Sequence, residues 1–144
     1  MFHIPVVLFL FKRKDTLEQI ISRIREVAPC KVYIVADGPR NEDERIATTE
    51  VREYVESLID WDCEVVKNYS ENNRGVYHNI GLGAKWVLSL EDSAIFLEDD
   101  NLPETTFFEY CRELLELYES DSRVLWICGT NYLGNKPEAN GASY

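Results

Sequence analysis

The sequence predicts an α/β fold in which a mostly parallel sheet is covered by helices on both faces. Strand-like and helix-like hydrophobic patterns alternate along the 144 residues, and no internal repeat interrupts them. The first strand-like run, residues 4–11, is almost entirely apolar, which is typical of a strand buried on both faces. Strong turn chemistry ends the second run at Asp37-Gly38-Pro39. Such alternation favours parallel strands joined by crossover helices.

The first half of the chain predicts three strands and two helices. A variant of the capping box, Asp15-Thr16-Leu17-Glu18, opens a helix that Pro29 ends. Residues 31–36 form the second strand, residues 63–66 a short third strand, and residues 68–75 a polar loop. The helix between the second and third strands carries one apolar face, formed by Val51, Tyr54, Val55, Leu58 and Ile59.

The second half predicts two helices and two strands. Residues 78–90 have a helical pattern, although the glycines within it each cost up to about 1 kcal/mol relative to alanine. The fourth strand follows, and Pro103 suits the first turn of the next helix. Residues 124–128 form the fifth strand. Two tryptophans fit apolar positions of these elements and are predicted to lie in the core: Trp86 and Trp126.

Composition limits the function classes. The formal net charge of -11 argues against binding to a nucleic-acid backbone, which needs a basic face. Residues 4–11 are too few to span a bilayer, so we expect no transmembrane segment. The four cysteines are far apart and form no C-x-x-C pair, which favours a reducing compartment. We therefore expect a cytoplasmic protein, either free or peripheral at the inner membrane face.

The acidic triplet Glu98-Asp99-Asp100 is the most informative motif. It follows the wholly apolar residues 94–97, so it stands at the carboxyl end of a buried strand. In open α/β sheets, ligands bind beyond this end of the strands. Three adjacent carboxylates repel one another, and a Mg²⁺ or Mn²⁺ ion that also holds substrate phosphates removes that repulsion. The alternative is a solvated acidic turn that favours the following helix N-terminus.

Three other segments are predicted to reach the same edge of the sheet. Asp37 follows the second strand and can accept a hydrogen bond from a base or a ribose, or serve only in an Asp-Gly turn. Arg13, within a Lys-Arg-Lys run, can grip a diphosphate, or belong to a solvated charge run. Arg74 can pair with phosphate, and His78 can touch the base or be structural.

With these motifs the chain resembles the nucleotide-sugar-binding half of a glycosyltransferase with the GT-A fold, a Rossmann-like architecture. It is most similar to the bacterial family-2-like enzymes related to N-acetylglucosaminyltransferase I. The triplet corresponds to that family's variant of the D-x-D motif. The resemblance covers essentially the whole chain and is carried by Phe11-Lys12-Arg13, Val35-Ala36-Asp37-Gly38, Asn73-Arg74-Gly75, residues 95–100, Phe107-Phe108-Glu109-Tyr110 and residues 124–129.

The resemblance implies roles for individual residues. Asp100 would be the direct ligand of Mn²⁺ or Mg²⁺. Glu98 and Asp99 would contact the donor sugar and the ribose. Three further residues would contact the nucleotide: Asp37 at the base, Arg13 near the base or the diphosphate, and His78 beside the base. The family's catalytic base lies in the acceptor-binding half, so no residue here is assigned that role.

Together, the residues and the resemblance predict a metal-dependent glycosyltransferase. It would move a sugar from a nucleoside diphosphate sugar to a saccharide or lipid-linked acceptor, with inversion at the sugar carbon. The first candidate for the donor is a UDP-sugar. Residues 1–144 are expected to form a single nucleotide-sugar-binding domain, truncated before the acceptor-binding half. Two alternatives remain open: a sugar-phosphate nucleotidyltransferase, which would normally carry a Gly-rich phosphate loop after the first strand, and a non-catalytic module that retains the fold.

Overall fold

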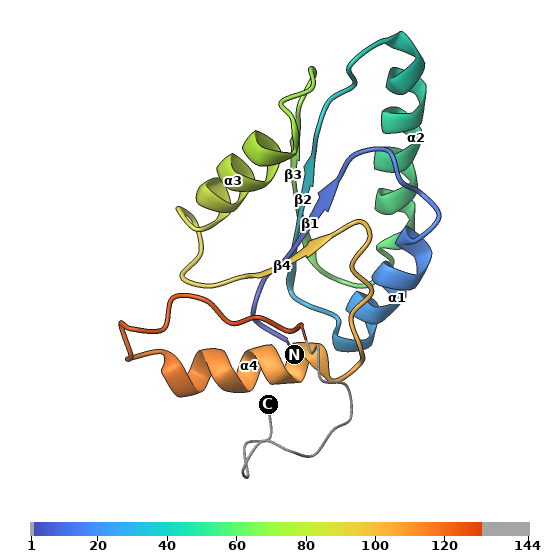
Figure 1. The fold of residues 1–144 in the computed structure, drawn as a ribbon. Helices are drawn as coiled ribbons and strands as arrows, with labels where there is room; N and C mark the ends of the chain where they lie inside the picture. Colours follow the sequence, from blue (N-terminus) through green and yellow to red (C-terminus); the bar gives the residue numbers. More distant parts are fainter. Residues whose placement is uncertain (1, 131–144) are drawn as a thin grey trace.

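The computed structural model describes residues 2–130 and confirms the α/β architecture. Four strands form one parallel sheet in the order β3-β2-β1-β4 (Figure 1). The strands are β1 (Val6–Leu10), β2 (Lys31–Ala36), β3 (Glu64–Tyr69) and β4 (Ile95–Glu98). The helices are α1 (Leu17–Val27), α2 (Glu42–Leu58), α3 (Val76–Val87) and α4 (Phe107–Tyr118).

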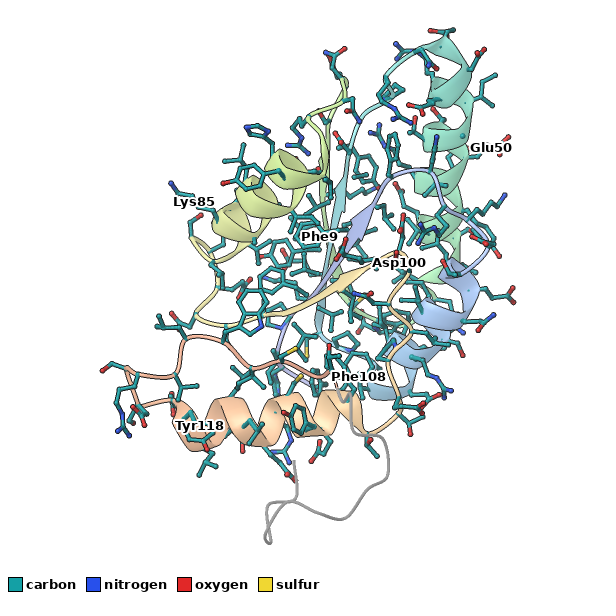
Figure 2. The ribbon with its side chains drawn as sticks, in the orientation of Figure 1. Phe9, Glu50, Lys85, Asp100, Phe108 and Tyr118 are labelled. Carbon is teal, nitrogen blue, oxygen red and sulfur yellow. The ribbon has the colours of Figure 1, made fainter. Side chains whose placement is uncertain are left out.

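Helices cover both faces of the sheet, as the sequence predicts. Leu8 and its alternate neighbours in β1 pack with apolar residues of α1, α2 and α4. Phe9 points to the other face, where it packs with Val87 of α3 (Figure 2). All five residues of β1 are buried, which explains why that strand is apolar throughout. Burial of each large aliphatic side chain contributes about 1.5–3 kcal/mol relative to exposure.

The start of α1 differs from the predicted capping box. Thr16 is the N-cap residue, and no side chain makes a capping hydrogen bond to the first turn. The Thr16 hydroxyl instead donates to the backbone carbonyl oxygen of Asp99, at the end of β4. A side chain that suits local capping is therefore used for a tertiary contact, which ties α1 to the acidic triplet.

Several element boundaries also differ from the prediction. β3 continues through Asn68 to Tyr69, because its register with β2 extends to the pair of Ala36 and Tyr69. α3 begins at Val76 and ends at Val87, so Leu90 lies in the following turn. Pro103 is not in the first turn of α4, which begins only at Phe107.

The predicted fifth strand is wrong. Residues 124–128 form no strand, and they run back along α4 (Figure 1). The hydroxyl of Tyr110 donates to the carbonyl oxygen of Cys128 at 3.2 Å. Trp126 is 79% exposed, so its predicted place in the core is also wrong. A strand needs a neighbouring strand to satisfy its backbone groups, and this apolar run has none among the described residues. Trp86, by contrast, packs edge-on against Tyr33 as expected.

No helix within residues 2–130 combines the length and the apolar character that crossing a bilayer requires.

The glycine at position 83 is required for packing between α3 and the sheet. A Cβ atom built there would lie 2.8 Å from the ring of Phe9 and 2.9 Å from a methyl group of Val35. Both neighbours belong to the buried cluster under α3 and have little room to move. At Gly81, in the same helix, a Cβ atom meets nothing within 4 Å. Close packing against the sheet therefore requires a glycine at position 83, whereas packing does not require one at position 81.

We expect Gly83→Ala to lower the free energy of unfolding and Gly81→Ala, its matched control, to raise it. Overpacking costs about 1–3 kcal/mol, whereas alanine gains up to about 1 kcal/mol over glycine in a helix. Urea denaturation of both variants measures the difference. If Gly83→Ala proved as stable as Gly81→Ala, the close contact of α3 with Phe9 and Val35 would be refuted.

Candidate functional site

The carboxyl ends of β1, β2 and β4 lie at one level and form a shared edge. The register pairs Phe9 of β1 with Val35 on one side and with Glu98 on the other. The backbone N–H of Asp37 then donates to the carbonyl oxygen of Leu10 at 2.9 Å. Because neighbouring strands are about 4.8 Å apart, the backbones following β2 and β4 are about 10 Å apart across the end of β1.

Arg13, Asp99 and Asp100 form one cluster at this edge. The Phe11 backbone N–H donates to Oδ2 of Asp99 at 3.3 Å, so the carboxylate continues the hydrogen bonding between β1 and β4. Arg13 Nη1 lies 2.6 Å from Oδ2 of Asp100 and 3.6 Å from Oδ1 of Asp99. The Asp100 side chain is 52% exposed, and it lies in the loop after β4 (Figure 2). Two predicted site residues from the segment after β4 thus meet one from the segment after β1.

The two aspartates of this cluster differ in environment. Burial raises the pKa of Asp99 above its ordinary value, and the Phe11 N–H and the Arg13 charge only partly offset this effect. The hydrogen bond to Asp100 raises the pKa of Arg13, so the guanidinium stays charged. The cluster therefore combines a shielded carboxylate, an accessible carboxylate and a fixed cation.

The two lysines beside Arg13 already have partners. Lys12 Nζ lies 2.7 Å from Oε1 of Glu44 in α2. Lys14 Nζ lies over the ring of Tyr54, 4.6 Å from its centroid. Arg13 is thus the cation of this run that lies against the acidic triplet.

Asp37 is buried, and loop donors surround its carboxylate. Oδ1 accepts hydrogen bonds from the N–H groups of Gly38 at 2.8 Å and Arg74 at 2.7 Å. Oδ2 accepts from the Gly75 N–H and the Asn73 side-chain amide, both at 3.0 Å. A carboxylate offers about four lone-pair positions, and these four donors occupy them. In this structure Asp37 therefore holds residues 73–75 against the end of β2 instead of presenting a free acceptor.

Two arginines lie beside Asp37. Arg74 Nη2 donates to the side chain of buried Asn79 at 2.8 Å, in the first turn of α3. Arg52 of α2 donates from Nη2 to the carbonyl oxygens of Asp37 at 2.9 Å and Ser70 at 2.7 Å. The Nε atoms of both arginines are buried and have no hydrogen-bond partner among the described residues. The sequence indicates a role for Arg74 but carries no motif that points to Arg52.

Glu98 and His78 stand apart from both groups of contacts. Glu98 is exposed at the end of β4. His78 is exposed on the first turn of α3, where its ring lies edge-on to Tyr77 with centroids 5.5 Å apart. The structure thus joins Arg13 to Asp99 and Asp100, and Asp37 to Arg74, but records no contact that joins Glu98 or His78 to these groups.

Few side chains at this edge of the sheet could bind a metal ion. Within residues 2–130, no group of three or more His, Cys, Asp or Glu side chains is arranged to hold a metal ion. Hard carboxylate oxygens nevertheless suit Mg²⁺ or Mn²⁺, which often keep waters and bind through one or two carboxylates plus substrate phosphates. Asp100 fits a site of that incomplete kind, in which the substrate supplies the remaining ligands.

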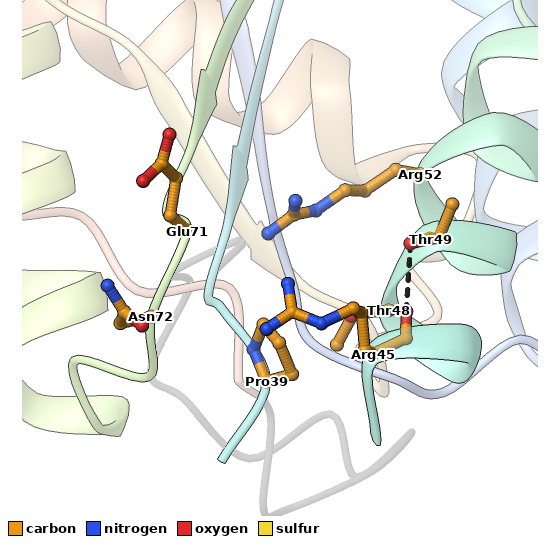
Figure 3. Close-up of a pocket in the computed structure, with 7 residues that line it drawn as sticks. All are labelled: Pro39, Arg45, Thr48, Thr49, Arg52, Glu71 and Asn72. Atoms are coloured by element: carbon orange, nitrogen blue, oxygen red, sulfur yellow. Dashed lines mark hydrogen bonds between the residues drawn. The ribbon is translucent and has the colours of Figure 1, made fainter. Parts of the chain in front are cut away.

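Two hollows are described, with volumes of about 330 and 420 Å³, and none of the predicted site residues lines either one. The larger lies between α1 and Leu102. The smaller lies between α2 and the loop after β3 (Figure 3). Neither hollow includes the cluster of Arg13, Asp99 and Asp100.

The groups that orient the site residues could not be predicted from the sequence. These are the Phe11 N–H and the Thr16 hydroxyl at Asp99, and the Asn73 amide and Arg52 around Asp37. Phe11 is 88 residues from Asp99 in the chain, and Asn73 is 36 residues from Asp37. A local sequence pattern holds no signal for such partners.

We expect Asp37→Asn to lower the free energy of unfolding by about 2–3 kcal/mol, because an amide group would face two N–H donors that the carboxylate now satisfies. Asp92→Asn, at an exposed turn, is the matched control and should change it by less than about 0.5 kcal/mol. Denaturant titration measures both, and hydrogen exchange at Arg74 and Gly75 should accelerate in Asp37→Asn. Unchanged exchange there would contradict the anchoring role.

Titration of Asp99 should follow the sign of its shift. With a folded-state pKa above the ordinary 3.8, the native state binds the proton more tightly than the unfolded chain, so this carboxyl lowers stability as the pH rises between the two values. Arg13→Gln removes a charge that favours the carboxylate and should raise the pKa of Asp99 further. Carbon-detected NMR of the carboxyl group measures both values. A lower pKa in the variant would show that Arg13 does not act on Asp99.

Comparison of the chain with protein-family models, curated proteins and solved structures gave no match. The function is therefore proposed from the chemistry of the strand edge and from the resemblance that its motifs carry.

Proposed function

We propose that this domain binds a nucleoside diphosphate sugar together with Mn²⁺ or Mg²⁺, as the donor-binding part of an inverting glycosyltransferase. The first candidate for the donor is a UDP-sugar. The observation that carries the proposal is the contact of Arg13 with Asp100, at 2.6 Å, at the carboxyl edge of a parallel sheet. A diphosphate–metal complex needs a cation and a hard anion at one place, and this contact provides both.

The ion pair itself is compatible with ligand binding. Both side chains are about half exposed, at 46% for Arg13 and 52% for Asp100. Such pairs contribute about 0–1 kcal/mol, so separating them costs little. In the proposal, Asp100 would hold the cation and Arg13 would contact the diphosphate. When bound, that cation neutralises the departing diphosphate as a Lewis acid.

The other predicted residues contact different parts of the donor in the proposal. Asp99 and Glu98 contact the ribose and the sugar. Arg74 pairs with phosphate, and His78 lies beside the base. Asp37 acts as a positioning residue that holds Arg74 and its loop, because a base N–H would have to displace one of its four present donors.

The acceptor is a saccharide or a lipid-linked saccharide. We expect no binding to nucleic acid, because the net charge of -11 would repel its phosphate backbone. A cytoplasmic location, free or at the inner membrane face, agrees with four widely spaced cysteines.

Calorimetry with UDP and Mn²⁺ tests the proposal on the full chain. We expect binding that requires the metal and that Asp100→Ala weakens by at least about 100-fold, because the variant loses the protein's metal ligand. Glu104→Ala is the matched control, since Glu104 is an exposed carboxylate four residues further on, and it should bind as the parent does.

Other outcomes distinguish the alternatives. Failure of the parent chain to bind UDP, with or without metal, would refute donor binding and favour a non-catalytic module. Formation of UDP-sugar from UTP and a sugar 1-phosphate would favour a nucleotidyltransferase. Metal-dependent hydrolysis or transfer of a UDP-sugar would support the glycosyltransferase.

A further inference from the structure

The hollow between α2 and the loop after β3 has no role in the proposed donor site. Its volume is about 330 Å³, enough for a small molecule. Figure 3 shows the guanidinium groups of Arg45 and Arg52 entering it from α2, with Glu71 and Asn72 on the opposite wall. Its walls therefore present two cations, one amide and one carboxylate.

The wall formed by the loop is held firmly in place. The Ser70 N–H donates to the Ala36 carbonyl oxygen at 3.0 Å, and the Ser70 hydroxyl donates to the Asn72 carbonyl oxygen at 2.6 Å. Gly38 approaches the same backbone so closely that a Cβ atom there would lie 2.4 Å from the carbonyl carbon of Asn72. The hollow is thus built into the fold, since its two walls are joined at the end of β2.

Arg52 carries a charge that no carboxylate within residues 2–130 neutralises by an ion pair. Its Nη2 reaches two backbone carbonyl oxygens, and its guanidinium lies 4.9 Å from the ring centroid of Tyr69. Its Nε is buried without a partner among the described residues. Burial lowers the pKa of Arg52, which reflects the cost of holding this cation away from water. An anion in the hollow would offset that cost.

Arg45 stands two helical turns before Arg52, so both side chains leave the same face of α2. Its Nε bonds Glu42 at 2.9 Å, but the two side chains are 55% and 80% exposed, and such a pair contributes little. The hydroxyl groups of Thr48 and Thr49 already donate to backbone carbonyl oxygens of the preceding turn. The donors left for a ligand are therefore the N–H groups of Arg45 and Arg52 that these contacts do not use.

We propose that this hollow binds the phosphate group of a small phosphorylated molecule, without a metal ion. A single guanidinium fork occupies both oxygens of a carboxylate, whereas a phosphate has three terminal oxygens and can meet two guanidinium groups together. Glu71 is the one opposing charge on the wall, and it should weaken the binding.

NMR titration of the full chain with inorganic phosphate, in parallel with glucose 1-phosphate, tests this site at constant ionic strength without divalent metal. We expect saturable shifts of the side-chain signals of Arg45, Arg52 and Asn72, with a dissociation constant of about 1 mM or tighter. Tighter binding of glucose 1-phosphate would assign the remaining space to the sugar, and equal affinity would assign the site to phosphate alone.

Variants then locate the binding. Arg45→Gln should weaken phosphate binding about tenfold or more, because it removes a positive charge from the wall. Glu71→Gln should strengthen it several-fold, because it removes the negative charge that repels the phosphate. Arg112→Gln, which removes an exposed arginine of α4 that is ion-paired with Glu109 and Glu116, is the control. Arg52→Lys keeps the charge but loses the planar fork, and should also weaken binding.

The absence of saturable shifts, or equal affinities in Arg45→Gln and Arg112→Gln, would overturn the phosphate site. Asp100→Ala should leave phosphate binding unchanged, so the site can fail or hold independently of metal-dependent UDP binding.

Discussion

The buried carboxylate of Asp37 is the contact on which the edge of the sheet depends. It gathers four donors from Gly38 and from residues 73–75, and so joins the end of β2 to the start of α3. A buried charge is stable only when its hydrogen bonds are complete, and here they are. The loop before α3 therefore has a fixed position, and Arg74 is brought next to Asp37.

A second set of contacts arranges the other side of the same edge. The Phe11 N–H and the Thr16 hydroxyl hold Asp99 by its side chain and its backbone, and this leaves Asp100 as the accessible acid. The shielded and the accessible carboxylate thus have different physical tasks. One fixes the loop to β1 and α1, and the other is available to a cation or to Arg13.

The sequence alone could predict how the site residues reach one edge but not how they are used there. Asp37 was interpreted as either a ligand contact or a turn, and the structure shows a third use, as the anchor of a loop 36 residues away. Arg52 had no distinguishing pattern, because its partners are backbone carbonyl oxygens at the ends of β2 and β3. Such partners depend on strand order, which neighbouring residues do not encode.

The order of the four strands and four helices, the apolar character of β1 and the acidic triplet at the end of β4 could all be predicted from the sequence itself. Hydrophobic period and turn chemistry are local properties, so they are legible in a single chain. The tertiary structure alone decided the pairing of Arg13 with Asp100 and the failure of residues 124–128 to form a strand. An ion pair and a strand each need a partner from elsewhere in the chain, and only the folded arrangement supplies or withholds it.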